Sequence, residues 1–218
     1  MIIVNHLVTF LTGFLALVYV SGAIGFCINP AFFAPFTPYN LLFTAFVFLI
    51  VQYKKSAGNR IFFIFLVISL IGFVSEVIGV KTGYVFGNYV YLDGLGIKFL
   101  NVPLVISLNW AIMVCCGAII SFHFFKSSFL ASLVSASLIT AVDLLIEQSA
   151  PKLNFWIFEN GMPGWHNYIG WWCLSFLATY WFRHDFSKLN RMVAYVVLSL
   201  ISLFFTVVYL FGKPVLSS

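Results

Sequence analysis

Two carboxylates close a long uncharged run. Asp143 and Glu147 lie four residues apart, so on a helix they would share one face. No charged residue occurs from Ser128 to Val142, and such an apolar run is typical of a membrane-spanning helix. Ionisable acids in such a segment are unfavourable unless they face protein or a water-filled cavity. The pair is therefore predicted to be catalytic.

A third acid, Glu76, lies towards the end of another apolar run. Gly72, Ser75 and Gly79 flank it at helical spacing, and small residues let helices approach closely. We therefore expect Glu76 to point into a helical bundle and to join the catalytic group. Before Asp143, a stripe of small or polar residues is predicted to point inward as well: Ser132, Ala136 and Thr140.

Several buried carboxylates near one another cannot all ionise cheaply, because burial and like-charge repulsion both oppose the charged form. At least one of the three acids is therefore expected to carry a proton at neutral pH. A proton donor in an apolar cavity can protonate an electron-rich alkene, and aromatic faces can stabilise the resulting carbocation. The aromatic residues expected near the acids are Tyr84, Tyr89, Tyr91, Trp110, Trp156, Trp165, Trp171 and Trp172. For each of them, the alternative is a place in an aromatic belt at the membrane interface.

Three polar residues are further candidates for binding substrate. His166 and Asn167 begin an apolar run beside Trp171, where His166 could relay a proton or place a water molecule. The alternative is that this loop histidine is merely solvated. Asn109 lies within an apolar run next to Trp110, so its amide must hydrogen-bond to a neighbouring helix or to a water on the substrate side.

Simpler explanations stay open for the acids. They could contact lipid headgroups or water, or form a structural ion pair with Lys81 or Lys152. No histidine pair with metal-ligand spacing and no glycine-rich phosphate loop occurs, so no metal site is predicted. The four cysteines lack C-x-x-C spacing and are expected to be small core residues.

The composition predicts an all-α, polytopic membrane protein. Of the 218 residues, 62% are hydrophobic and 8% are charged, whereas soluble domains carry about 25% charged residues. The mean hydropathy is +1.06. The net charge of +5 comes from short loops between apolar runs, so it does not indicate a nucleic-acid partner. Residues 1–218 are expected to form a single transmembrane helical domain.

About seven spans are predicted, because roughly 20 apolar residues cross a bilayer. They are His6–Ile28, Tyr39–Tyr53, Ile61–Val80, Pro103–Phe125, Ser128–Glu147, Asn167–Phe182 and Met192–Phe211. The first is expected to be retained, since it lacks the basic start and cleavage site of a secretory signal. The three prolines within Asn29–Pro38 are expected to prevent a helix there.

The basic residues predict an orientation in a cell inner membrane. A cytoplasmic N-terminus puts seven of them on the inside: Lys54, Lys55, Arg60, Lys126, Arg183, Lys188 and Arg191. Four then lie outside: Lys81, Lys98, Lys152 and Lys213. In either orientation the three acids lie near one membrane face, from which the two long loops Lys81–Asn101 and Gln148–His166 also emerge.

Four stretches of the chain form a recognisable set of motifs: EVIGVKTGYVFGNYVY from Glu76, VPLVISLNW from Val102, DLLIE from Asp143 and NYIGWW from Asn167. Together they resemble a known family, the carotenoid biosynthesis membrane proteins of bacteria and archaea. The resemblance runs from about Ile61 to Trp172, and its E-x-x-G-x-x-T-G-x-x-F-G-x-Y pattern is its most specific part. The family includes cofactor-independent carotenoid 1,2-hydratases, also called bisanhydrobacterioruberin hydratases.

The resemblance implies hydration of the terminal 1,2 double bond of an acyclic carotenoid end, which gives a tertiary alcohol. It implies a lyase of carotenoid and isoprenoid biosynthesis that needs no cofactor. Its partners would be a carotenoid substrate from the bilayer and membrane lipid, and possible further partners are other carotenoid-pathway enzymes. The proton donor is expected to be Asp143 or Glu147, with the other acid and Glu76 tuning it or activating water.

Three other functions stay open. A carotene or isoprenoid cyclase or isomerase would use the same acid but let an alkene quench the cation. A carotenoid-binding or transport protein would need no acid. A retinal photoreceptor would need a lysine in the last span, and Met192–Phe211 contains none.

Overall fold

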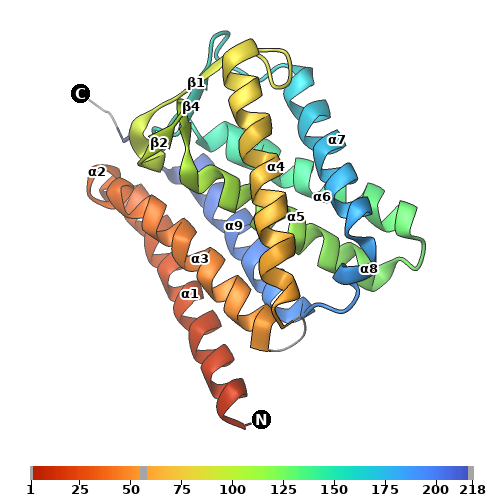
Figure 1. Cartoon of the computed structure of the whole chain (residues 1–218). Helices are drawn as coiled ribbons and strands as arrows, with labels where there is room; N and C mark the ends of the chain where they lie inside the picture. The colour runs from red at the N-terminus through yellow and green to blue at the C-terminus, as the bar shows by residue number, and fades with distance from the viewer. Residues whose placement is uncertain (1, 55–57, 216–218) are drawn as a thin grey trace.

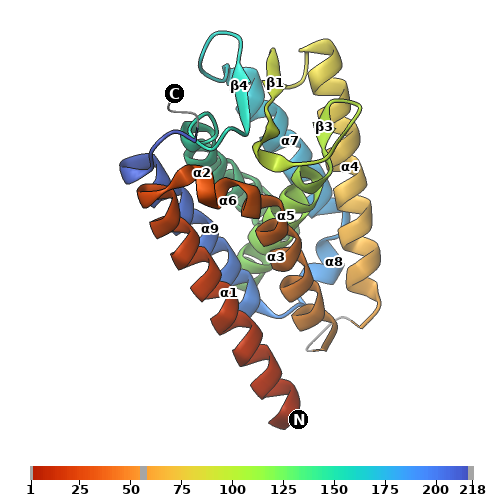
Figure 2. The same ribbon diagram turned by 90° about the vertical axis from the view of Figure 1, so that its left-hand side faces the viewer.

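The protein is a bundle of long helices around one central helix, α5 (Figures 1 and 2). The computed structural model describes residues 2–54 and 58–215, so Lys55 lies outside the described residues. Most of α5 is buried, whereas less than half of the apolar window is buried in each of the other apolar helices of membrane-spanning length. The long helices are α1 (Ile2–Ile28), α3 (Thr37–Gln52), α4 (Arg60–Thr82), α5 (Leu104–Phe124), α6 (Ser128–Ser149), α7 (Trp165–Trp181) and α9 (Arg191–Phe211).

Within the described ranges, six helical stretches are long and apolar enough to cross a membrane, as expected for an integral membrane protein. The prediction of an all-α polytopic bundle is thus confirmed. Helix α7 has 17 residues, or about 26 Å at 1.5 Å per residue, slightly less than a bilayer core of about 30 Å. It packs beside α6 but is shorter than each of the six apolar stretches, so the seventh span stays a prediction, as does the orientation.

The expectation that prolines prevent a helix within Asn29–Pro38 is wrong. Short helices α2 (Pro30–Phe33) and η1 (Ala34–Phe36) follow α1 and lead directly into α3. Each proline occupies the first turn of its element, where no backbone N–H is needed for the helical ladder. The Asn29 side chain caps α2 by accepting from the Phe32 N–H. The second apolar stretch therefore runs from Pro30 to Gln52.

Two small sheets lie at the end of the bundle opposite the N-terminus (Figure 1). Strand β1 (Tyr89–Tyr91) pairs antiparallel with β4 (Trp156–Phe158), and β2 (Lys98–Phe99) pairs with β3 (Val102–Pro103). Two short helices complete the fold, η3 (Asp93–Leu95) and α8 (Arg183–Phe186). The β1–β4 pairing joins the α4–α5 loop to the α6–α7 loop, which confirms that the two long loops share one face.

Candidate active site

The three acids predicted to be catalytic line one small cavity. Glu76 comes from α4, whereas Asp143 and Glu147 come from the last two turns of α6. The cavity measures about 40 Å³. Its other lining residues come from β1, α5, α6, β4 and α7: Tyr89, Tyr91, Ile106, Asn109, Trp110, Met113, Ile139, Ile146, Trp156, Asn167 and Trp171. We call this space the acid cavity.

Glu147 is held by two N–H donors. The indole Nε1 of Trp156 donates to Glu147 Oε2 and the amide Nδ2 of Asn167 donates to Glu147 Oε1, both over 2.8 Å. Glu147 as a whole is only 6% exposed. Each oxygen of the carboxylate thus accepts one hydrogen bond. An N–H donor binds a charged oxygen more strongly than a protonated one, so this arrangement favours the charged carboxylate.

Glu76 receives a hydrogen bond from the phenol of Tyr89. Residues two apart on a strand share one face, so β1 turns both Tyr89 and Tyr91 inward and leaves Val90 exposed. Burial, together with the nearby Glu76, raises the pKa of both tyrosines above its usual value. Both phenols therefore stay neutral hydrogen-bond donors across the physiological pH range.

Asp143 differs from the other two acids in its hydrogen bonding. Its Oδ2 is buried and has no hydrogen-bond partner among the described residues, and the same holds for Nε1 of Trp110 in the same cavity. The ion pairs of the described residues are Arg60–Asp185 and Lys98–Asp93, so neither Lys81 nor Lys152 neutralises the cluster. A buried carboxyl group with an oxygen that accepts no hydrogen bond and with no cation nearby is less unfavourable when protonated than when charged.

Small residues on α4 let the aromatic walls approach the acids. A Cβ on Gly72 would lie 2.5 Å from the Trp110 ring, and one on Gly79 would lie 2.5 Å from the Phe86 ring. This confirms that the face of α4 bearing Glu76 points into the bundle. The predicted stripe of α6 is also buried or half-buried along its length: Ser132, Ala136, Thr140, Asp143 and Glu147.

Aromatic rings surround the acid cavity. Tyr91 lies edge-to-face against Tyr89, with ring centroids 5.5 Å apart, and against Trp156 at 5.8 Å. On the other side, the Trp110 and Trp171 rings are 5.6 Å apart. These π faces are placed where they would stabilise a cation formed beside the carboxylates.

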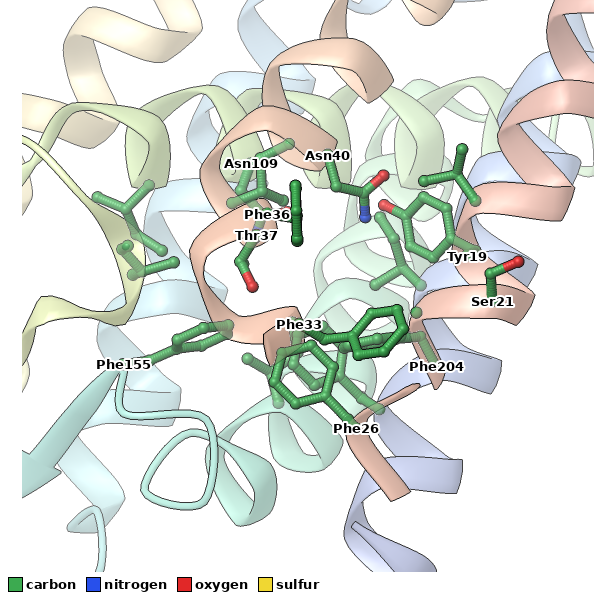
Figure 3. A pocket seen from close by; sticks show the side chains of 18 of the residues that line it. Tyr19, Ser21, Phe26, Phe33, Phe36, Thr37, Asn40, Asn109, Phe155 and Phe204 are labelled. Atoms are coloured by element: carbon green, nitrogen blue, oxygen red, sulfur yellow. The ribbon is translucent and has the colours of Figure 1, made fainter. Parts of the chain in front are cut away.

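A second, larger cavity adjoins the acid cavity. It measures about 340 Å³ and is lined mainly by apolar side chains of α1, α2, α3, α5 and α9 (Figure 3). Phe26, Phe33 and Phe204 gather on one side of it, and Phe155 enters from the α6–α7 loop. We call it the apolar cavity. The two cavities are adjacent, because four residues line both of them: Ile106, Asn109, Ile146 and Trp156.

Ten of the fourteen residues expected at the site line the acid cavity: Glu76, Tyr89, Tyr91, Asn109, Trp110, Asp143, Glu147, Trp156, Asn167 and Trp171. The structure does not bring Tyr84, Trp165, His166 and Trp172 there. Tyr84 is 88% exposed because Gly83, with φ of +68°, ends α4 and turns the chain away. His166 is exposed and stacks on the exposed Trp165. Neighbouring residues of a helix point about 100° apart, and on α7 it is Asn167 that points into the bundle.

Sequence reasoning missed part of what the lining residues do. Trp156 was expected only to offer a π face, whereas it also donates to Glu147 and lines both cavities. The contributions of α1, α2 and α9 to the apolar cavity carry no motif that would mark them in one sequence. Within the described ranges, no group of three or more His, Cys, Asp or Glu residues is placed to hold a metal ion.

Comparisons with known proteins identify the family of the chain. The chain is 26% identical over 170 residues to bisanhydrobacterioruberin hydratase of Haloarcula japonica. The aligned region covers 70% of this chain and 56% of the relative, so the chain spans little more than half of that protein's length. No solved structure matches the chain. The family model described as "Carotenoid biosynthesis protein" matches residues 36–216, which is wider than the stretch of resemblance found by motif. The chain therefore belongs to the carotenoid biosynthesis protein family.

Proposed function

We propose that this protein is a hydratase that adds water across the terminal 1,2 double bond of an acyclic carotenoid end group. Its family and its hydratase relative support a carotenoid-modifying enzyme. The observation that supports hydration of a carotenoid end group is the position of the two cavities side by side. A larger apolar cavity lies next to a small cavity lined by three carboxylic groups, as an enzyme acting on the tip of a polyene requires.

The larger chamber fits an apolar chain. Its volume of about 340 Å³ lies within the range of about 300–1,000 Å³ that is usual for small-molecule sites. A carotenoid is longer than this chamber, so the far part of the polyene would remain in the bilayer. Only the reacting end would be enclosed by the protein.

Asp143 is the best candidate for the proton donor. Its Oδ2 lacks a partner in the acid cavity, whereas the oxygens of Glu147 each accept an N–H. Glu147 would stay ionised beside it and would stabilise the positive charge that develops on the substrate. Glu76 on α4, held by Tyr89, would add negative potential to the same cavity.

The reaction balances with these groups alone. The carboxyl O–H of Asp143 gives its proton to the less substituted alkene carbon, so a C–H bond forms, the π bond breaks and a tertiary cation remains. The oxygen of a water molecule forms a C–O bond to that cation. The protonated alcohol then returns one proton to the carboxylate of Asp143. The net change is one alkene and one water converted to one tertiary alcohol, without oxidant or reductant.

Expression in cells that make lycopene or a monocyclic carotene tests the proposal. The expected product is a carotenoid heavier by one water. Asp143→Asn and Glu147→Gln should each lower its yield by about 100-fold or more, the range for loss of a general acid. Equal amounts of membrane-inserted protein must be verified by immunoblot. An isomerised product of unchanged mass would instead indicate a cyclase or isomerase.

A further inference from the structure

Asn109 is the polar residue at the boundary between the two cavities. It lies on the central helix α5 and is only 9% exposed. It lines the apolar cavity (Figure 3) and also the acid cavity. Its side-chain amide makes no hydrogen bond to any residue that the structure describes. Asn167 in the same cavity differs, because its amide donates to Glu147 over 2.8 Å. Asn109 therefore presents an unpaired donor and acceptor to the enclosed space.

A buried amide is unfavourable without a hydrogen-bond partner, so such a group marks a place for a polar ligand or a water molecule. The acid cavity has room, since about 40 Å³ exceeds the roughly 10–15 Å³ that one water needs. A second unpaired group, Oδ2 of Asp143, lines the same cavity. Two polar groups that could hold a water are thus present in one cavity.

We propose that Asn109 positions the water that captures the carbocation, and thereby determines how often protonation ends in hydration. This inference rests on the proposed hydratase function. Asn109 suits the role because its carbonyl accepts a hydrogen from water, which turns a water lone pair towards the cation. Trp110 and Trp156 also line the cavity, but an indole N–H only donates and cannot orient water in this way.

The cation has two fates that both balance. Water adds to it, a C–O bond forms and the surplus proton returns to a carboxylate. Alternatively, an adjacent C–H bond breaks, its proton goes to the carboxylate and an alkene is formed again. In deuterated water the second fate leaves deuterium in the unhydrated carotenoid. The ratio of hydrated product to deuterium-labelled alkene therefore measures how well water is positioned, separately from how fast the acid protonates.

The test compares the full-length wild type with Asn109→Leu, which has nearly the same shape. Membranes from expressing cells receive an acyclic carotenoid in deuterated water, and mass spectrometry follows both products. We expect Asn109→Leu to lower hydration by about tenfold or more, as for loss of one catalytic hydrogen bond, while deuterium exchange stays within about twofold. Asn109→Ser, which keeps an acceptor, should recover part of the hydration.

Asn40→Leu is the matched control. Asn40 also has an unpaired, buried amide oxygen, but it lines only the apolar cavity. Its substitution should leave the ratio of hydration to exchange at the wild-type value, even if total turnover changes. Parallel loss of both activities in Asn109→Leu and Asn109→Ser, or an unchanged ratio, would overturn the inference while leaving the hydratase proposal standing. A wild type that neither hydrates nor exchanges would overturn both.

Discussion

Trp156 donates its indole N–H to Glu147 Oε2 over 2.8 Å, although the two residues lie on opposite sides of the turn that ends α6. The same indole lines the acid cavity and the apolar cavity. Strand β4 holds it in register opposite Tyr91 of β1. One tryptophan thus connects the loop outside the helices to the carboxylate inside them.

Replacing Trp156 by phenylalanine should impair catalysis through Glu147. Trp156→Phe keeps an aromatic wall but removes a charge-assisted hydrogen bond, which is worth about 1.5–3 kcal/mol. If that bond stabilises the transition state, hydration slows by roughly tenfold or more. The measurement is the initial rate of product formation in membranes containing equal amounts of protein.

Trp172→Phe is the matched control for this substitution. The Trp172 indole donates to Ser137 Oγ at the exposed side of α7, and it lines neither cavity. It should therefore retain the wild-type rate. A similar loss of rate in both variants would mean that tryptophan supports the helices and not Glu147.

Much of the fold could be predicted because the positions of membrane helices depend on short, continuous stretches of sequence. Uncharged runs of lipid-crossing length mark the helices, and their order places the three acids at one end. The β1–β4 pairing could not be predicted, because Tyr91 and Trp156 are separated by two complete helices. The helical path through Pro30 was also missed, since prolines interrupt a helix or begin one depending on position.

The acids of the site could be predicted because charge inside an apolar run is rare and costly. The helical spacing of small and polar residues around Glu76 and Asp143 then predicted that both acids point into the bundle. The apolar cavity could not be predicted, because its walls consist of phenylalanine and aliphatic residues like those of any membrane helix. Gly22 belongs to that wall, yet nothing nearby in the sequence distinguishes it from Gly13.

Filling the apolar cavity should exclude the substrate. Gly22 lines it, and a Cβ there would lie an ordinary 3.6 Å from Phe204, so a larger side chain would extend into the open space. Gly22→Leu is expected to reduce hydration by about tenfold or more at limiting carotenoid, because the leucine occupies volume needed by the polyene. Dose–response assays with carotenoid in vesicles measure this effect.

Gly13→Leu provides the comparison on the same helix. Gly13 is exposed on α1, and a Cβ added to it meets nothing within 4 Å. This variant should hydrate carotenoid at the wild-type rate. Full activity of Gly22→Leu would exclude the apolar cavity from the substrate path.

Alkaline pH should destabilise the wild type through its buried tyrosines. Burial near Glu76 raises the pKa of Tyr89 and Tyr91 above the usual value of about 10. Above pH 10 the unfolded chain therefore loses these protons while the folded protein keeps them, so stability falls as pH rises. The slope is at most about 1.4 kcal/mol per pH unit for each tyrosine. Below pH 10 the two residues contribute no slope.

Thermal unfolding in detergent between pH 8 and pH 11 measures this dependence. Tyr89→Phe and Tyr91→Phe should each flatten the decrease in Tm above pH 10. Tyr84→Phe should leave it unchanged, since Tyr84 is 88% exposed. Identical pH curves for Tyr91→Phe and the wild type would contradict the buried environment assigned to β1.

The central claim is that the acid cavity protonates a carotenoid end and that water captures the cation. Turnover of an acyclic carotenoid in heavy-oxygen water tests it most directly, with wild-type protein and Asp143→Asn compared in the same membranes. The account predicts a wild-type product that carries one heavy oxygen and almost none from Asp143→Asn. Equal labelled product from both proteins, or a wild-type product without the heavy oxygen, would contradict it.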